Sequence, residues 1–318
     1  MRIQQLSGDQ VSADTVVGRV LTHDVGHRMR KGMFIGPEHV EALQRLPEVH
    51  VLELEPGDVH EDAAALRLGA AVAGPGTDVQ EPVQSQVRLT ANRRGLVRVD
   101  RSAVDRLNLL PAMSVFTLVD GQAIDEGQEV AGAKITPVAV AGTVLAQAER
   151  LARERGPVIE VDGFRPLRTK VVVTERLKPK ARELFARAVT RKLGWYGAEM
   201  LPVREVDTGR QEGLFAGASS IDPLDAAYAE LAAAGGELLR QGVPAHPGSM
   251  LWLGHLGHAT VLGVASCAGF GKNTSLDLLL PFVFAYGEAR ETDFQSLGYG
   301  GLIEEGAGRR FPPYPDWD

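Results

Sequence analysis

The chain has 318 residues, with 34 lysines and arginines against 41 aspartates and glutamates, which gives a formal charge of −7. This length predicts two domains or one large one. Apolar residues make up 44% and charged residues 24% of the chain, which excludes wholesale disorder. The acidic balance argues against nucleic-acid binding, which needs surplus cations. Cys267 is the only cysteine, which excludes an intramolecular disulfide.

The N-terminal segment, residues 1–21, has no continuous apolar stretch and contains Asp9 and Asp14. We therefore expect no secretory signal. The longest apolar run, residues 276–286, is interrupted by Asp277 and Pro281, and it is shorter than the roughly 20 residues of a membrane span. These features predict a cytoplasmic protein that contacts no membrane.

Residues 1–163 are expected to form a mostly β region with short helices. Helices are predicted at 39–46, 58–73 and 145–155, and Asp58 is a plausible N-cap for the second. Residues 91–95, which end in a glycine, lie between two apolar runs and predict a hairpin. Further strands are predicted at 49–54, 86–90, 96–99, 115–119, 127–130 and 135–140.

Residues 164–305 are expected to form an α/β domain, followed by an extended tail over 306–318. Consecutive valines within 170–174 predict a buried strand. After Pro179, apolar residues at offsets 0, 3, 4, 7, 8 and 12 from Ala181 predict one apolar helix face. The remaining patterns predict strands at 200–206, 214–216, 251–253 and 260–264, a turn at 254–258, and helices at 222–234 and 276–286.

Three turns of this second half follow predicted strands and precede predicted helices, where open α/β sheets bind ligands. Helix N-termini offer unpaired N–H groups that suit phosphates and other anions. The first turn, 174–178, contributes Arg176 and Lys178, which are either anion contacts or part of a solvated loop. In the second turn, 217–225, small residues would let a ligand approach the backbone.

The second turn also carries two aspartates with two possible roles. Asp222 is placed to cap the following helix, and Asp225 to reinforce its first turn. Alternatively, the two carboxylates could hold Mg²⁺ together with a substrate phosphate.

The third turn, 266–274, superficially suggests a P-loop. Ser266 replaces the first glycine of that motif and Asn273 replaces its hydroxyl residue, so ATP-dependent chemistry here is the weaker alternative. An anion-cradling loop with Lys272 as a point charge is the better interpretation. Cys267 is either a reactive thiol or a buried one. In a fourth, rigid turn at 243–250, His246 is either a ligand contact or an exposed side chain.

Short motifs follow one another in order along the chain: Gly-Ala-Ser-Ser at 217–220, Gly-Gly at 235–236, Pro-Gly at 247–248 and Leu-Gly-Tyr-Gly-Gly-Leu at 297–302. Together with motifs from residue 18 onward, this order resembles the molybdopterin-binding family, in the branch similar to molybdopterin molybdotransferase (MoeA-like). The resemblance implies a three-layer α/β domain that binds molybdopterin, a pterin dithiolene bearing a phosphate, or the molybdenum cofactor. It also implies a homo-oligomer.

In active members of that branch, molybdate is inserted into adenylylated molybdopterin with Mg²⁺, so a transferase is one implied activity. Asp222 and Asp225 would then be the catalytic and metal-binding residues. The candidate cofactor-binding residues are Arg176, Lys178, Gly217, Ala218, Ser219, Ser220, His246, Pro247, Gly248, Ser249, Ser266, Cys267 and Lys272.

Two departures from the family pattern keep an alternative open. The family's Leu-Pro-Gly-Asn loop is Val-Ala-Ser-Cys at 264–267, and only residues 207–213 connect two predicted strands that a helix usually separates. Parallel neighbours need a longer crossover, so the sheet would be re-threaded or open at one edge. The alternative function is a non-catalytic scaffold or sensor that kept the fold but lost the ligand.

Overall fold

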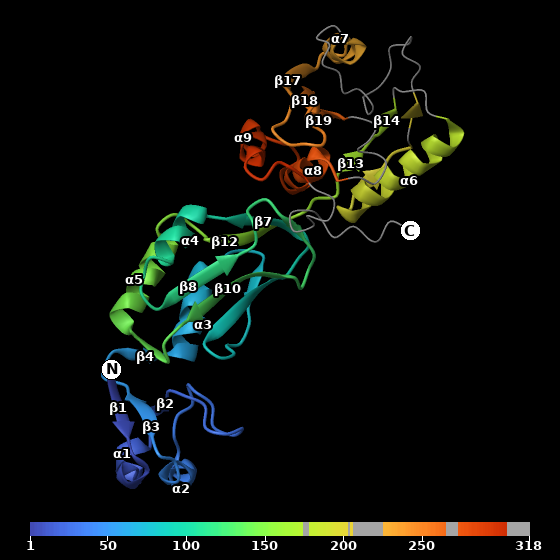
Figure 1. Cartoon of the computed structure of the whole chain (residues 1–318). Coiled ribbons are helices and arrows are strands. Elements are labelled where there is room, and N and C mark those ends of the chain that lie inside the picture. Colours follow the sequence, from blue (N-terminus) through green and yellow to red (C-terminus); the bar gives the residue numbers. More distant parts are fainter. Residues whose placement is uncertain (174–177, 203, 206–224, 265–272, 304–318) are drawn as a thin grey trace. The chain divides into compact units, whose positions relative to one another are not determined.

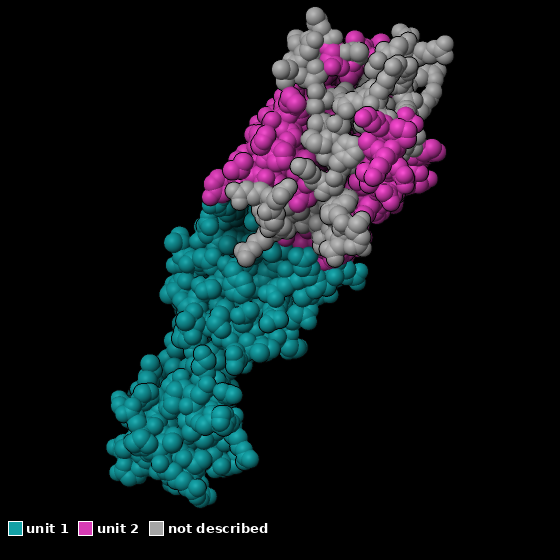
Figure 2. Space-filling model, turned by 45° about the vertical axis from the view of Figure 1, so that its right-hand side comes forward, with its two compact units in different colours: residues 1–92, 98–120, 126–161 teal, residues 93–97, 121–125, 162–318 magenta. Residues whose placement is uncertain are grey.

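The computed structural model describes residues 1–173, 178–202, 204–205, 225–264 and 273–303. Both helices and strands occur along these residues, so the chain is a mixed α/β protein, as predicted (Figure 1). It divides into two compact units, coloured separately in Figure 2. Unit 1 comprises residues 1–92, 98–120 and 126–161, and unit 2 comprises residues 93–97, 121–125 and 162–318.

Unit 1 begins with a small antiparallel sheet. Its strands are β1 (Arg2–Leu6), β3 (Val49–Glu53) and β2 (Val20–Leu21), in that order. Four short helices belong to the same part of the chain: η1 (Gly8–Gln10), α1 (Ala13–Val16), η2 (Pro37–His39) and α2 (Val40–Gln44). Val16, Leu43 and Val49 are completely buried in one apolar cluster, so these elements share a core.

The rest of unit 1 is an antiparallel sheet with helices packed on it. The strand order is β5 (Thr77–Val79), β6 (Gln86–Ala91), β10 (Glu129–Ile135) and β8 (Met113–Thr117). Helix α3 (Glu61–Val72) contacts β6, β10 and α5 (Gly142–Arg153), and α4 (Arg101–Leu107) contacts α5 and β8. A separate ladder joins β4 (Asp58–His60) to β11 (Ala139–Ala141).

Three predictions for this half of the chain are wrong. The strands predicted at 127–130 and 135–140 are not separated by a turn, because β10 runs without a break from Glu129 to Ile135 and β11 follows at Ala139–Ala141. β6 does not form a hairpin with β7 (Gly95–Val99), because its partners are β5 and β10, while β7 pairs with β9 (Ala123–Ile124). Residues 58–60 form a strand because they pair with β11, so the helix predicted from Asp58 starts at Glu61 instead. Its N-cap is His60, whose Nδ1 accepts a hydrogen bond from the backbone N–H of Asp62.

Unit 2 contains a parallel β-α-β arrangement. β13 (Arg168–Thr169) pairs with β15 (Glu199–Met200), and β14 (Val172–Val173) pairs with β16 (Arg204–Glu205), both in parallel. Helix α6 (Pro179–Trp195) makes the crossover that parallel neighbours require. Strand β12 (Ile159–Gly163) precedes this arrangement and belongs to a sheet of order β12-β7-β9.

The second half of unit 2 is an antiparallel sheet with three helices. The strand order is β17 (Glu237–Gln241), β18 (Trp252–Leu256) and β19 (Ala259–Gly263), and α7 (Ala226–Ala233) contacts β17. Helices α8 (Ser275–Tyr286) and α9 (Glu291–Gln295) follow, and η4 (Ser296–Gly298) extends α9. Leu279 of α8, Phe294 of α9 and Leu253 of β18 share one buried cluster.

The predictions for α6 and α8 are confirmed to within two residues, and the hairpin of β18 and β19 is confirmed with a shorter turn. That turn is Gly257-His258, so His255, predicted to lie in it, is part of β18. β17 and α9 were not predicted. The predicted strand 214–216 and the connection 207–213 lie outside the described residues. Among the helices that the structure describes, none has the length and apolar character to cross a membrane.

Candidate functional site

The predicted turn at 243–250 is held against the start of α8 through Pro247 and Gly248. The backbone N–H of Ser275 donates to the carbonyl oxygen of Pro247 over 2.9 Å, and its hydroxyl donates to the carbonyl oxygen of Gly248 over 2.6 Å. Gly248 has a φ of +103°, and a Cβ there would lie 2.9 Å from the Ser275 nitrogen and closer still to its hydroxyl. Only glycine therefore fits this close contact.

A second set of hydrogen bonds holds the other end of the turn. The backbone N–H of His246 donates to Gly301 over 2.8 Å, and that of Ile303 donates to the carbonyl oxygen of His246 over 2.7 Å. The side chains of His246 and Ser249 are nevertheless exposed. The backbone of the turn is thus fixed while these two polar side chains stay accessible to a ligand.

Two backbone amides at the start of α8 are already hydrogen-bonded within the protein. The N–H of Thr274, the N-cap residue, donates to the Asp277 carboxylate over 2.8 Å, and the N–H of Ser275 is bound to Pro247. The prediction that helix N-terminal amides are free for an anion is therefore wrong for these two groups. Any anion at this end of α8 would have to bind to groups other than these two amides.

Asp277 in turn forms a buried ion pair with Lys192 of α6. The Lys192 Nζ lies 2.7 Å from Oδ1 and 2.9 Å from Oδ2 of Asp277, and the two side chains are 2% and 0% exposed. A buried charge is tolerated when it is paired and hydrogen-bonded, as it is here. The pair therefore ties helix α6 to the first turn of α8.

Two further predicted site residues lie at helix starts. Asp225 is the N-cap of α7, and its carboxylate accepts from the N–H of Ala227 over 2.9 Å. Because α7 begins at Ala226, Asp225 caps this helix rather than lying within its first turn. Lys178 is the N-cap residue of α6, and it is exposed.

The other predicted site residues lie outside the described part of the chain. They are Arg176, Gly217, Ala218, Ser219, Ser220, Asp222, Ser266, Cys267 and Lys272. Among the described residues, no group of three or more histidine, cysteine, aspartate or glutamate side chains is placed to hold a metal ion. The described residues therefore do not make up a Mg²⁺ site, and we derive no step through one.

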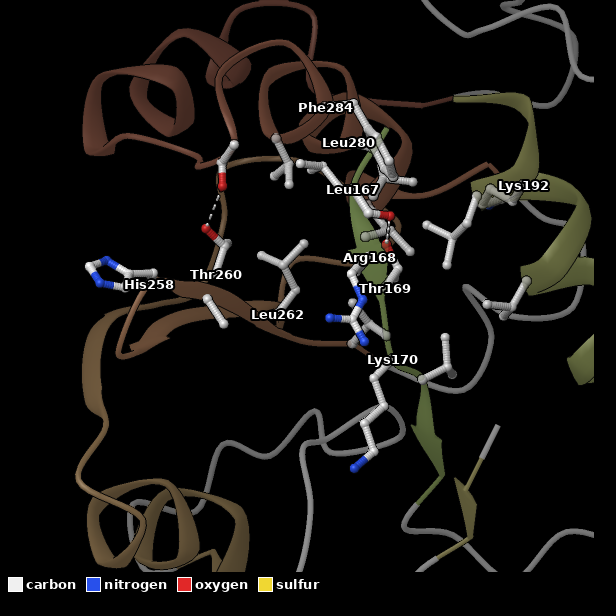
Figure 3. Close-up of a pocket in the computed structure, with 18 of the residues that line it drawn as sticks. Leu167, Arg168, Thr169, Lys170, Lys192, His258, Thr260, Leu262, Leu280 and Phe284 are labelled. Carbon is white, nitrogen blue, oxygen red and sulfur yellow. Dashed lines mark hydrogen bonds between the residues drawn. The ribbon is translucent and has the colours of Figure 1, made fainter. Parts of the chain in front are cut away.

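A cavity of about 330 Å³ lies within unit 2 (Figure 3). Its walls come from residues 167–171, α6, β19 and α8. Most of the lining is apolar, with the larger side chains contributed by Leu167, Phe185, Leu262, Leu276, Leu280 and Phe284. Sites for small molecules are usually clefts of roughly 300–1,000 Å³ with such apolar walls, so this cavity is large enough for a ligand.

The charged side chains that line the cavity are all basic in the described part of the chain: Arg168, Lys170 and Lys192. His258, in the turn between β18 and β19, also lines it. Figure 3 shows the Arg168 guanidinium on the side of its strand that faces Leu262. Lys192 is neutralised by Asp277, so Arg168 and Lys170 supply the net positive charge.

The cavity was not predicted from the sequence, although one signal pointed to part of it. Lys192 lies eleven residues after Ala181, which places it on the apolar face of α6. A lysine on an apolar face needs a buried partner, and that requirement could have indicated Asp277. Arg168 and Lys170 carried no comparable signal, because charged residues near strand ends are ordinary.

No model of a protein family matches the sequence, and no curated protein matches it. The resemblance to the MoeA-like branch therefore rests on the order of the motifs in the sequence.

Proposed function

We propose that unit 2 binds molybdopterin or the molybdenum cofactor and acts in its biosynthesis or handling. The observation that carries this proposal is the attachment of the Pro247–Gly248 turn to Ser275 at the start of α8. The resemblance assigns cofactor-binding roles both to this turn and to residues 266–272, which directly precede Asn273. The anchored turn thus lies against the start of the helix that follows residues 266–272 in the sequence.

The exposed polar side chains of the anchored turn support a ligand that is bound through side chains. His246 and Ser249 are exposed on the anchored turn, and Lys272 comes three residues before Ser275 in the sequence. A pterin phosphate would use such groups, since the amides of Thr274 and Ser275 already have acceptors. A three-layer domain, a homo-oligomer and molybdate insertion are further parts of the proposal, as is a Mg²⁺ role for Asp222 and Asp225.

The test is to purify the full chain anaerobically from cells that make the cofactor. Bound pterin is measured by fluorescence after oxidation, and molybdenum by elemental analysis. The expected result is pterin close to one equivalent per chain. Absence of both pterin and molybdenum from protein purified under cofactor-replete growth would contradict the proposal.

The second candidate is a scaffold or sensor that has lost the ligand. It is favoured by the use of Asp225 as a helix cap and by the occupied amides at the start of α8. A ligand that binds the native state must stabilise it by mass action. A melting temperature that does not rise at any concentration of added molybdopterin would therefore favour the scaffold.

A further inference from the structure

We infer that the cavity of unit 2 is a second binding site, which takes a small organic anion with an apolar body and one phosphate or carboxylate group. Of the residues predicted to bind the pterin, those that the structure describes do not line this cavity. The inference thus goes beyond the proposed function and does not depend on it.

The walls of the cavity determine the chemical character and the size of the part of the ligand that lies against them. Leu262 of β19 and Leu280 and Phe284 of α8 offer apolar surface, which favours a ring or a branched alkyl group. A volume of about 330 Å³ is at the lower end of the usual range for small-molecule sites. It suits a ligand of one or two rings better than a large cofactor.

The charged side chains that line the cavity determine the sign of the ligand's charge. Neither Arg168 nor Lys170 forms an ion pair with any residue that the structure describes. The register neighbour of Arg168 on β15 is Glu199, and no ion pair joins the two. A guanidinium beside apolar walls can bind phosphate or carboxylate through two parallel hydrogen bonds.

Asp277 cannot replace a ligand as the anionic partner of Arg168 and Lys170. Both oxygens of Asp277 are engaged by Lys192, and one of them also accepts from Thr274. The Lys192–Asp277 pair contributes no net charge to the cavity. An entering anion would therefore meet a net positive field from Arg168 and Lys170, and it would not have to break the buried pair.

The charge requirement is tested by titration calorimetry of the full chain with 1-naphthyl phosphate, 1-naphthol and inorganic phosphate. We expect 1-naphthyl phosphate to bind at least tenfold more tightly than the other two. The Arg168→Gln variant should raise its Kd about tenfold and leave the Kd of 1-naphthol unchanged. Arg165→Gln is the matched control, because Arg165 is exposed, lies three residues earlier and does not line the cavity.

Filling the cavity is the second test. Leu262→Trp should abolish binding of 1-naphthyl phosphate, and Ala259→Phe, at an exposed position that also lines the cavity, serves if the first variant does not fold. The inference is wrong if 1-naphthyl phosphate does not bind, or if its Kd is the same in Arg168→Gln and Arg165→Gln. It is also wrong if Leu262→Trp alters only self-association, because the cavity would then be a contact between copies of the chain. Each of these results would leave the pterin measurements above unaffected.

Discussion

Lys192 and Asp277 are 85 residues apart in the sequence, yet their side chains form a fully buried ion pair with 2.7 Å between Nζ and Oδ1. Lys192 lines the cavity of unit 2, and Asp277 binds the N–H of Thr274 at the start of α8. The next residue, Ser275, holds the Pro247–Gly248 turn. One chain of contacts therefore connects the cavity to the proposed pterin-binding turn.

Replacing Lys192 with methionine should strongly destabilise unit 2. The change leaves the Asp277 carboxylate buried without its counter-charge, which typically costs about 3–5 kcal/mol of unfolding free energy. The double variant Lys192→Met/Asp277→Asn should recover most of this loss, since it removes the orphaned charge. Urea unfolding followed by tryptophan fluorescence reports the effect, because all three tryptophans, Trp195, Trp252 and Trp317, belong to unit 2. Equal stability of the single and double variants would contradict the ion-pair explanation.

Loosening the Pro247–Gly248 turn should lower the amount of pterin that co-purifies. Ser275→Ala removes the hydroxyl that binds Gly248 and should cost about 1 kcal/mol. Gly248→Ala combines a backbone with positive φ and a clash with Ser275, so it should cost roughly 1–3 kcal/mol. Bound pterin per folded chain is the readout, and Ser296→Ala, which removes a hydroxyl bonded to the Asp293 carbonyl, is the control. If the amount of bound pterin per folded chain is unchanged in both turn variants, this turn is not part of the binding site.

The role of Asp225 can be decided by two substitutions. Asp225→Ala removes the cap of α7 and should cost about 0.5–2 kcal/mol, whereas Asp225→Ser keeps a capping oxygen and should cost much less. If Asp225 only caps the helix, the serine variant should retain any Mg²⁺-dependent molybdate insertion. If the serine variant is as stable as the parent but has lost that activity, the carboxylate has a further role.

Unit 1 should respond to pH through Glu61. This side chain is buried, and its burial, followed by the repulsion of Asp62, raises the pKa of Glu61 above its ordinary value of 4.5. The folded state then binds the proton more tightly than the unfolded chain does. Ionisation of the buried Glu61 therefore lowers the stability of unit 1. This loss of stability is absent below about pH 4.5 and is complete once the pH exceeds the raised pKa of Glu61.

Glu61→Gln should therefore stabilise unit 1 at pH 7 and change little at pH 4. Thermal unfolding followed by circular dichroism at the two pH values measures this, because unit 1 contains no tryptophan. The exposed Glu41 of α2 provides the matched control, Glu41→Gln. A gain that is equal at both pH values would show that desolvation of the charge is not the cause.

The sequence by itself determined the local elements of this protein. The apolar face after Pro179 predicts α6, and the apolar run before Gly287 predicts α8. A helix brings together residues that are three and four apart in the sequence, so the sequence itself shows which side chains share a face. The mixed α/β class follows from the same local patterns.

The tertiary structure alone decided which distant surfaces meet. A strand pattern does not specify its partner, so β6 pairs with β10 instead of β7, and residues 58–60 join β11 instead of starting a helix. The same holds for the attachment of Gly248 to Ser275 and for the basic cavity beside Leu262. These contacts depend on how whole helices and strands pack against one another. The sequence around each contacting residue does not specify the distant residue that it will contact.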